Sequence, residues 1–123
     1  MNRVMHFELS VQDAEKAIPF YSEVFGWKVE KWDGPINYWL VTTGEEKDPG
    51  IDGAIMLHEN HFPPTVLVVD VDDIDPVLEK VKQSGGEIIL PKSPIPGMGY
   101  SAYFKDPQGV TMGVYQTDRS ASF

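Results

Sequence analysis

Two histidines and one glutamate are the residues of this chain best suited to chemistry. His6 and Glu8 lie two residues apart in the strand-like segment Val4–Val11, and because strand side chains alternate between faces, both point the same way. His58 ends another strand candidate. Two imidazoles and a carboxylate suffice to bind a divalent metal, and His6 and Glu8 alone would suffice for acid–base catalysis. The sequence leaves open the alternative that Glu8 pairs with a nearby donor and the histidines are ordinary polar lining.

Other kinds of chemistry find no support in the sequence. The chain has no cysteine, which excludes disulfides, zinc–thiolate sites and a thiol nucleophile. It has no Ser/His/Asp arrangement and no glycine-rich phosphate loop. The stretch His58-Glu59-Asn60-His61 resembles a metal motif in composition, but it spans a strand end and a proline-bounded linker rather than a helix. We interpret its histidines as surface-loop residues.

A repeat of about sixty residues organises the elements that position these side chains. Val11-Gln12-Asp13 recurs as Val71-Asp72-Asp73, and Phe25-Gly26 recurs as Gly85-Gly86, both 60 residues later. In each copy a strand precedes an aspartate that suits a helix N-cap, and the helix that follows ends at glycine. Three strand candidates separated by Gly/Pro/Asp turns follow each helix. The sequence therefore predicts an α+β fold of two βαβββ modules.

The expected boundaries make one domain of residues 1–123, with module one at 3–58, a linker at 59–64, module two at 65–116 and a frayed tail at 117–123. Pro19 should kink or shorten the first helix, because it removes a backbone donor. The predicted strands are Val4–Val11, Trp27–Trp32, Asn37–Thr43, Gly53–His58, Thr65–Val71, Glu87–Leu90, Tyr100–Phe104 and Val110–Gln116.

Period-two alternation assigns side chains to the two faces of each sheet. The side packed on the helices should carry Met5, Phe7, Leu9, Val11, Ile55, Leu57, Leu67, Val69, Val71, Met112 and Val114. The opposite faces should curve and together enclose a cup suited to a small molecule. Its expected lining is His6, Glu8, Met56, His58, Val66, Val68, Gly113 and Tyr115.

Two further segments carry aromatic candidates. Tyr38 and Trp39 alternate along a strand, so one faces the cup and the other the helix. The loop Ile95–Tyr100 places glycines on both sides of Met98. It is either a flap that closes Met98 and Tyr100 over a ligand, or a hairpin without a ligand role.

The motifs at both ends of the repeat resemble a known family. Val4–Asp13, followed by Val24-Phe25-Gly26-Trp27, is similar to the opening of vicinal-oxygen-chelate proteins, and Tyr103–Gly109 is similar to their late Asp-Pro-x-Gly hairpin. That superfamily includes glyoxalases, bleomycin-resistance proteins and extradiol dioxygenases. The resemblance implies one metal ligand on the first and last strand of each module, at positions occupied here by His6, Met56, Val66 and Gly113. Since only His6 can bind a cation, we expect the family's metal site to be lost and no cofactor to be needed.

Charge and composition limit the kinds of partner and the cellular location that we expect. There are 10 Lys and Arg against 19 Asp and Glu, a net charge of −9, which disfavours nucleic acid as a partner. The acidity mainly serves solubility, and it points any ligand search toward cations first. No apolar run is long enough for a membrane helix and no signal-peptide pattern is present, so we expect a cytoplasmic protein.

These observations predict a protein that binds a small organic ligand in the cup without the four-ligand metal site and, by the resemblance, works as a homodimer. The alternative is a lyase, isomerase or dioxygenase whose divalent metal is held by His6, Glu8 and His58. A third class is a non-catalytic interaction protein. The candidate catalytic residues are His6 and Glu8, and the candidate ligand-binding residues are His6, Glu8, Tyr38, Trp39, Met56, His58, Met98, Tyr100 and Tyr115.

Overall fold

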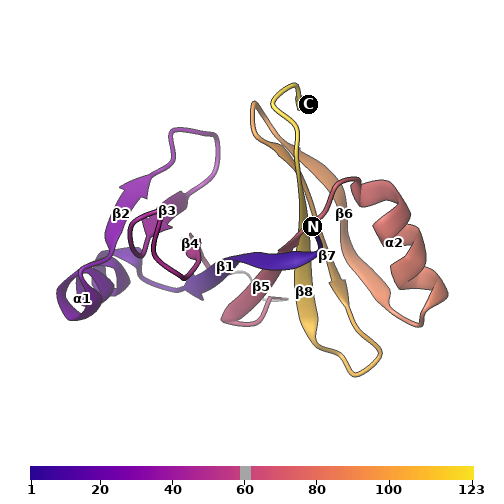
Figure 1. The fold of residues 1–123 in the computed structure, drawn as a ribbon. Coiled ribbons are helices and arrows are strands. Elements are labelled where there is room, and N and C mark those ends of the chain that lie inside the picture. Colours follow the sequence, from indigo (N-terminus) through magenta and orange to yellow (C-terminus); the bar gives the residue numbers. More distant parts are fainter. Residues whose placement is uncertain (59–61) are drawn as a thin grey trace. The chain divides into compact units, whose positions relative to one another are not determined.

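The computed structural model describes residues 1–58 and 62–123. Within these residues the chain runs twice through the order βαβββ, which confirms the α+β fold and the repeat (Figure 1). The elements are β1 (Arg3–Val11), α1 (Ala14–Phe25), β2 (Lys28–Lys31), β3 (Tyr38–Thr42), β4 (Asp52–Leu57), β5 (Thr65–Asp70), α2 (Ile74–Gln83), β6 (Glu87–Ile95), β7 (Gly99–Lys105) and β8 (Thr111–Thr117).

The elements form two compact units. The first unit comprises His6–Val66, and the second comprises Met1–Met5 together with Leu67–Phe123. The strand order is β2-β3-β4-β1 in the first unit and β5-β8-β7-β6 in the second. In each sheet the first and last strands of the module pair in parallel and the remaining pairs are antiparallel. We call the face of each sheet that points away from its helix the far face. The cup that both far faces would enclose stays a prediction.

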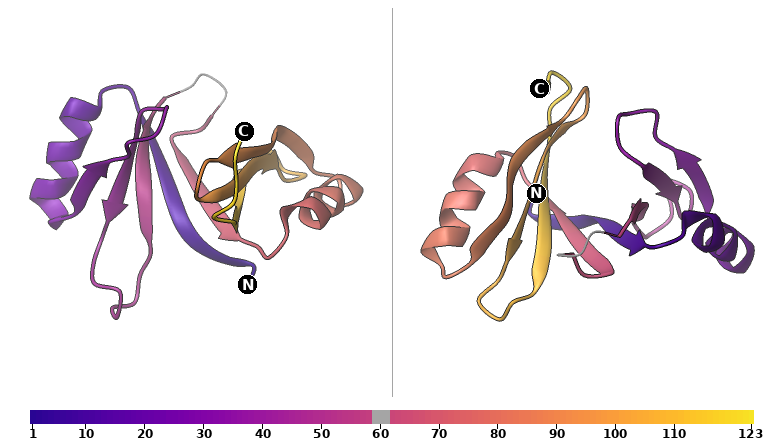
Figure 2. Two further views of the ribbon diagram at one scale, coloured as in Figure 1. Left: turned by 90° about the horizontal axis from the view of Figure 1, so that it is seen from above. Right: turned by 180° about the vertical axis from the view of Figure 1, so that it is seen from behind.

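Both helices begin as the repeat predicts, and α1 also ends at its predicted glycine, whereas α2 ends at Gln83 with Ser84 as its C-cap. The Asp13 carboxylate accepts a hydrogen bond from the backbone N–H of Lys16 at 3.3 Å, and the Asp73 carboxylate accepts one from Asp75 at 3.2 Å. Gly26 ends α1 in the left-handed conformation, with φ of 71°. The helix α1 continues through Pro19, so the expected shortening is wrong, and both views of Figure 2 show one continuous coil. A proline removes only one backbone hydrogen bond, and the remaining bonds carry the helix past it.

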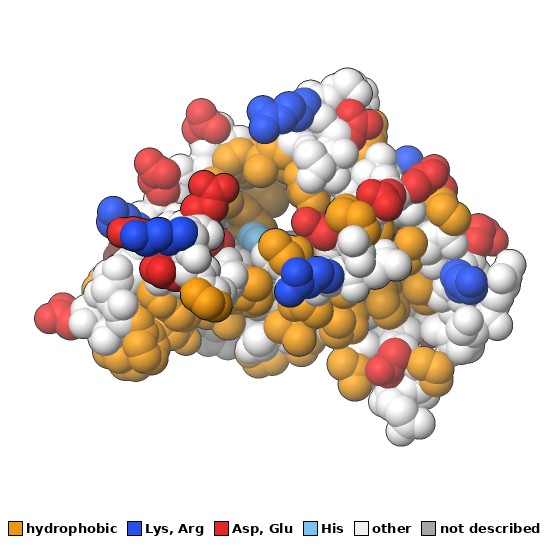
Figure 3. Space-filling view, in the orientation of Figure 1, with side chains coloured by type: hydrophobic (Ala, Val, Ile, Leu, Met, Phe, Trp, Pro, Cys, Tyr) orange, Lys and Arg blue, Asp and Glu red, His pale blue; other side chains and the backbone are white. Residues whose placement is uncertain are grey.

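The helix α1 presents a set of apolar side chains to the solvent. Phe20, Val24 and Phe25 are exposed, and Figure 3 shows hydrophobic side chains gathered over α1, at the lower left. On the inner side of the helix the Tyr21 ring stacks on Trp27 with centroids 5.3 Å apart, and Phe7 reaches the same Trp27 at 5.7 Å. These ring contacts fix α1 to its sheet and confirm that Phe7 faces the helix.

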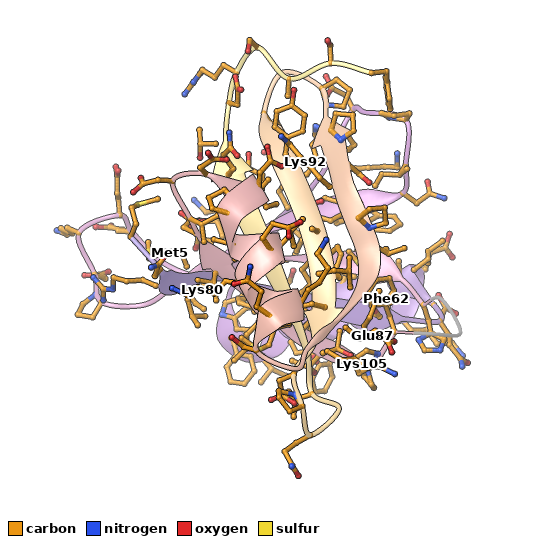
Figure 4. The ribbon with its side chains drawn as sticks, turned by 90° about the vertical axis from the view of Figure 1, so that its right-hand side faces the viewer. Met5, Phe62, Lys80, Glu87, Lys92 and Lys105 are labelled. Carbon is orange, nitrogen blue, oxygen red and sulfur yellow. The ribbon has the colours of Figure 1, made fainter. Side chains whose placement is uncertain are left out.

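In the second unit the helix α2 covers one face of the sheet (Figures 1 and 4). Figure 4 looks onto this helix and labels Lys80 on it and Lys92 on the neighbouring strand β6. The Lys92 ammonium lies 3.2 Å from the Asp75 carboxylate, which ties β6 to the start of α2. The predicted core is confirmed for Val69, Val71 and Val114, which lie in one cluster with Val77, Leu78, Ile74, Ala102 and Phe104.

Three apolar residues assigned to the core are exposed instead. Leu67 has an exposed fraction of 42 %, and Met5 and Leu57 are also exposed. Leu57 ends β4, and alternation alone cannot show how far along a strand the helix covers it. The core assignment of these three residues is therefore wrong.

Strand β6 is longer than predicted. It was expected to end at Leu90, but it continues through Pro91 and Pro94 to Ile95. Prolines are tolerated here because β6 is the edge strand, and its pairing with β7 shifts register between Ile88 and Leu90 and again before Ser93. The Gly/Pro segment after it is a tight turn, closed by a hydrogen bond from the N–H of Met98 to the carbonyl of Ile95.

The residues after Thr117 are not frayed, which corrects the expectation for the tail. The N–H of Gly97 donates to the carbonyl of Ala121 at 3.0 Å, and the N–H of Asp118 donates to the carbonyl of Met98 at 2.9 Å. Ala121 is buried. The tail thus holds the β6–β7 turn, so the structure favours the hairpin interpretation of this segment over the closing flap. Among the described residues, neither helix is long and apolar enough to cross a membrane.

Candidate functional site

A hydrogen-bonded chain of three side chains lies on the far face of the first unit. The hydroxyl of Tyr38 donates to Glu8 Oε2 at 2.9 Å, and His6 Nε2 lies 3.1 Å from the same hydroxyl oxygen. Glu8 has an exposed fraction of only 5 %, whereas His6 and Tyr38 are half-buried. We call His6, Tyr38 and Glu8 the relay.

The sheet order explains how these residues meet. His6 and Glu8 lie on β1 and Tyr38 lies on β3, with β4 between the two strands. On β4, Ala54 is the register partner of Glu8, and Met56 is the partner of Tyr38. Because β4 lies between them, β1 and β3 are about 10 Å apart. The side chains of Glu8 and Tyr38 can meet over β4 only when the residue beneath them is small. The methyl side chain of Ala54 leaves that space.

The donors and acceptors of the relay fix the direction of its hydrogen bonds. The single hydroxyl hydrogen of Tyr38 goes to the carboxylate of Glu8, so the contact with His6 requires Nε2–H as the donor. This arrangement holds the imidazole in one orientation and can pass a proton along its length.

His58 does not join the relay. His6 is the register partner of Asp52 in the parallel pair of β1 and β4, so His58 lies six residues further along, about 20 Å away at the rise of a strand. His58 is exposed. Among residues 1–58 and 62–123 no group of three or more His, Asp or Glu side chains could hold a metal ion. The cluster of His6, Glu8 and His58 is therefore not formed, and Glu59, Asn60 and His61 lie outside the described residues.

The four positions that the resemblance assigns to a metal do not form a suitable donor set. His6 is committed to the hydroxyl of Tyr38 through Nε2. Val66 is buried and apolar. A Cβ added at Gly113 would lie 3.0 Å from the ring of Tyr103, so that ring covers the fourth position. A thioether, an isopropyl group and a glycine offer no oxygen or nitrogen ligand, and we derive no chemistry through a metal.

The other predicted site residues are distributed over both units. Trp39 is the register partner of Ile55, on the face opposite to Tyr38, and the structure does not bring it together with the relay. Tyr100 lies under the Lys92 ammonium, which is 4.6 Å from the ring centroid. Tyr115 lies on the far face of the second unit, opposite Ser101. Of the predicted ligand residues, the structure thus gathers His6, Glu8, Tyr38 and Met56 on one face.

The sequence and structure are consistent with the comparisons to known proteins. A family model described as the Glyoxalase/Bleomycin resistance protein/Dioxygenase superfamily matches residues 3–114. The chain belongs to this superfamily. A solved structure titled as hypothetical protein BH1468 from Bacillus halodurans has the same fold, with a TM-score of 0.72 and 16 % identity over 98 % of both chains.

Two curated relatives illustrate the range of the superfamily. The chain is 28 % identical over 122 residues to a lactoylglutathione lyase from Neisseria meningitidis. The aligned region covers 87 % of this chain and 85 % of the relative. It is 29 % identical over 118 residues to "Putative glyoxylase CFP32" from Mycobacterium tuberculosis, which covers 91 % of this chain. The chain spans only 44 % of the length of that mycobacterial relative.

Proposed function

We propose that this superfamily member binds a small organic cation at the relay, without a divalent metal. The observation that carries the proposal is the buried Glu8 carboxylate, hydrogen-bonded to Tyr38, which in turn contacts His6. A ligand would touch the half-buried Tyr38 and His6, and Glu8 would act behind them as the source of negative charge.

The physical argument is electrostatic. A charge buried at this level is screened by water much less than a surface charge, so it attracts a nearby cation more strongly. The net charge of −9 adds a weaker attraction at longer range. Met56, a half-buried side chain on the same face, supplies apolar contact for the body of a ligand. An amidinium or ammonium group with a planar apolar body matches this combination.

The likeness to lactoylglutathione lyase favours a shared binding surface more than a shared reaction, because three of the four positions assigned to the metal carry no oxygen or nitrogen ligand here. We also propose a cytoplasmic homodimer, in which the dimer is what the superfamily resemblance implies. Gel filtration tests the dimer, since the chain has a mass of 13.8 kDa and the dimer twice that.

Benzamidine is a suitable probe, because it joins a planar ring to a cation with N–H donors. We expect it to shift amide resonances around His6 and Tyr38 in an NMR titration of isotope-labelled protein in EDTA. The Tyr38→Phe and Glu8→Gln variants should each raise the dissociation constant at least fivefold. Tyr21→Phe is the matched control, because Tyr21 lies on α1 and contacts Trp27 through its ring. Equal affinity in wild type, Tyr38→Phe and Glu8→Gln would overturn the proposal.

A further inference from the structure

A second group of side chains lies on the far face of the second unit, around Tyr115. In the parallel pair of β5 and β8, Asp70 is the register partner of Tyr115, and across β8 the partner of Tyr115 is Ser101 on β7. Register partners share a face of the sheet, so a carboxylate, a phenol and a small hydroxyl side chain lie side by side. This group contains no residue of the relay.

The Tyr115 ring lies against the sheet over a glycine. A Cβ added at Gly99 would lie 2.9 Å from Cζ and from the hydroxyl oxygen of Tyr115, closer than real side chains approach. The absence of a side chain at Gly99 therefore allows the ring to lean across the start of β7. Tyr103 repeats the arrangement on the same face, where its Cε1 lies 3.0 Å from a Cβ added at Gly113.

The charge of Asp70 acts on this ring. Burial first, and then the negative charge of Asp70, raise the pKa of the Tyr115 hydroxyl above 10.0, while a hydrogen bond with Thr117 and the charge of Arg119 oppose the rise. A carboxylate beside an aromatic face is a combination that recognises an organic ammonium ion, because the ring and the carboxylate both attract the cation. Arg119 lies near enough to act on the pKa of Tyr115, so its positive charge would oppose the binding of a cation at this ring.

We propose that Asp70 and Tyr115 form a subsite for an aromatic ammonium ion, made of residues that do not belong to the relay. The ammonium group lies between the Asp70 carboxylate and the Tyr115 ring, and the aromatic body of the ligand extends over the far face toward Tyr103. The glycines at 99 and 113 are the sequence feature that lets the rings of Tyr115 and Tyr103 lie close to the sheet. The proposal for the subsite is argued from Asp70, Ser101 and Tyr115 alone and uses no residue of the relay.

Benzyltrimethylammonium is the probe that separates this subsite from the relay. It carries a cation and an aromatic ring but no N–H donor, so it can satisfy a ring and a carboxylate without hydrogen bonding. We expect an NMR titration to shift the amides of Asp70 and Tyr115, and we expect benzyl alcohol, its uncharged counterpart, to leave them unchanged.

Substitutions then measure how much Asp70, Tyr115 and Arg119 each contribute to the affinity for the probe. Asp70→Asn should raise the dissociation constant of the probe about fivefold or more, and Tyr115→Leu should do the same, whereas Tyr115→Phe keeps the ring and should stay within twofold. Arg119→Ala should bind the probe more tightly, because a positive charge that acts on Tyr115 is gone. Equal binding by wild type, Asp70→Asn and Tyr115→Leu would overturn the proposal. If Tyr115→Leu fails to fold, the affinity of Asp70→Asn for the probe tests the subsite by itself. A benzamidine titration that shows no binding at the relay would not change the result for the subsite.

Discussion

Removal of the Tyr38 hydroxyl offers the sharpest test of the relay as a structural unit. Tyr38→Phe deletes one hydrogen bond to a carboxylate that is only 5 % exposed, so water cannot readily replace the lost donor. A hydrogen bond to a charged group contributes about 1.5–3 kcal/mol to stability. At about 2 cal/mol/K of unfolding entropy per residue, a chain of 123 residues loses about 4 °C of melting temperature per kcal/mol. We therefore expect Tyr38→Phe to melt about 6–12 °C below wild type.

Chemical denaturation of four proteins isolates the contact between Tyr38 and Glu8. Wild type, Tyr38→Phe, Glu8→Gln and the double variant form a double-mutant cycle, in which we expect a coupling free energy of about 1 kcal/mol or more. Tyr21→Phe makes the same chemical change on α1, at a ring that stacks on Trp27, and should stay within about 0.5 kcal/mol of wild type. The contrary result is a coupling free energy of zero, in which Tyr38→Phe lowers the free energy of unfolding by the same amount in wild type and in the Glu8→Gln variant. The hydrogen bond between Tyr38 and Glu8 would then not contribute as described.

Three further predictions follow from other parts of the fold. Gly113→Ala places a Cβ 3.0 Å from the Tyr103 ring and should lower the free energy of unfolding by about 1–3 kcal/mol in urea; an unchanged midpoint would contradict the packing. Because the pKa of Tyr115 is raised above 10.0, the folded state keeps this proton after the unfolded chain has lost it, so stability should fall as pH rises past 10. That loss should be smaller in Tyr115→Phe. Hydrogen bonds from the Ser120 hydroxyl and N–H hold the pKa of Asp118 below 3.8. In Ser120→Ala this pKa should rise toward 3.8, as measured by NMR titration, and an unchanged pKa would contradict the assignment.

The repeat made most of the fold predictable from the sequence. Asp13 and Asp73 mark both helix starts, and each strand except β6 lies within one residue of its expected bounds. These signals are local, because capping and alternation depend on neighbours in the chain. Where long-range packing decides, prediction failed. The prolines of β6 are compatible with a strand only because it lies at the sheet edge, and the tail is ordered by bonds to a turn twenty residues earlier in the chain.

The candidate site was predictable only in part, for a related reason. Alternation correctly placed His6 and Glu8 on one face, and it predicted that one of Tyr38 and Trp39 lies on the cup side. The choice of Tyr38 required the pairing of β3 with β4, which alternation does not reveal. The same missing information misplaced His58, since only the register of β1 with β4 shows that it lies about 20 Å from His6. Nothing in the sequence indicated that Ala54 leaves room for the tyrosine to cross the strand.

The most direct test of the central claim is to locate bound benzamidine by NMR, through nuclear Overhauser effects between the probe and protein side chains in the presence of EDTA. Binding at the relay predicts cross-peaks from the benzamidine ring protons to the rings of Tyr38 and His6 and to the methyl group of Met56. Cross-peaks confined to other residues, or cross-peaks that arise only after a divalent metal is added, would contradict metal-free binding at the relay.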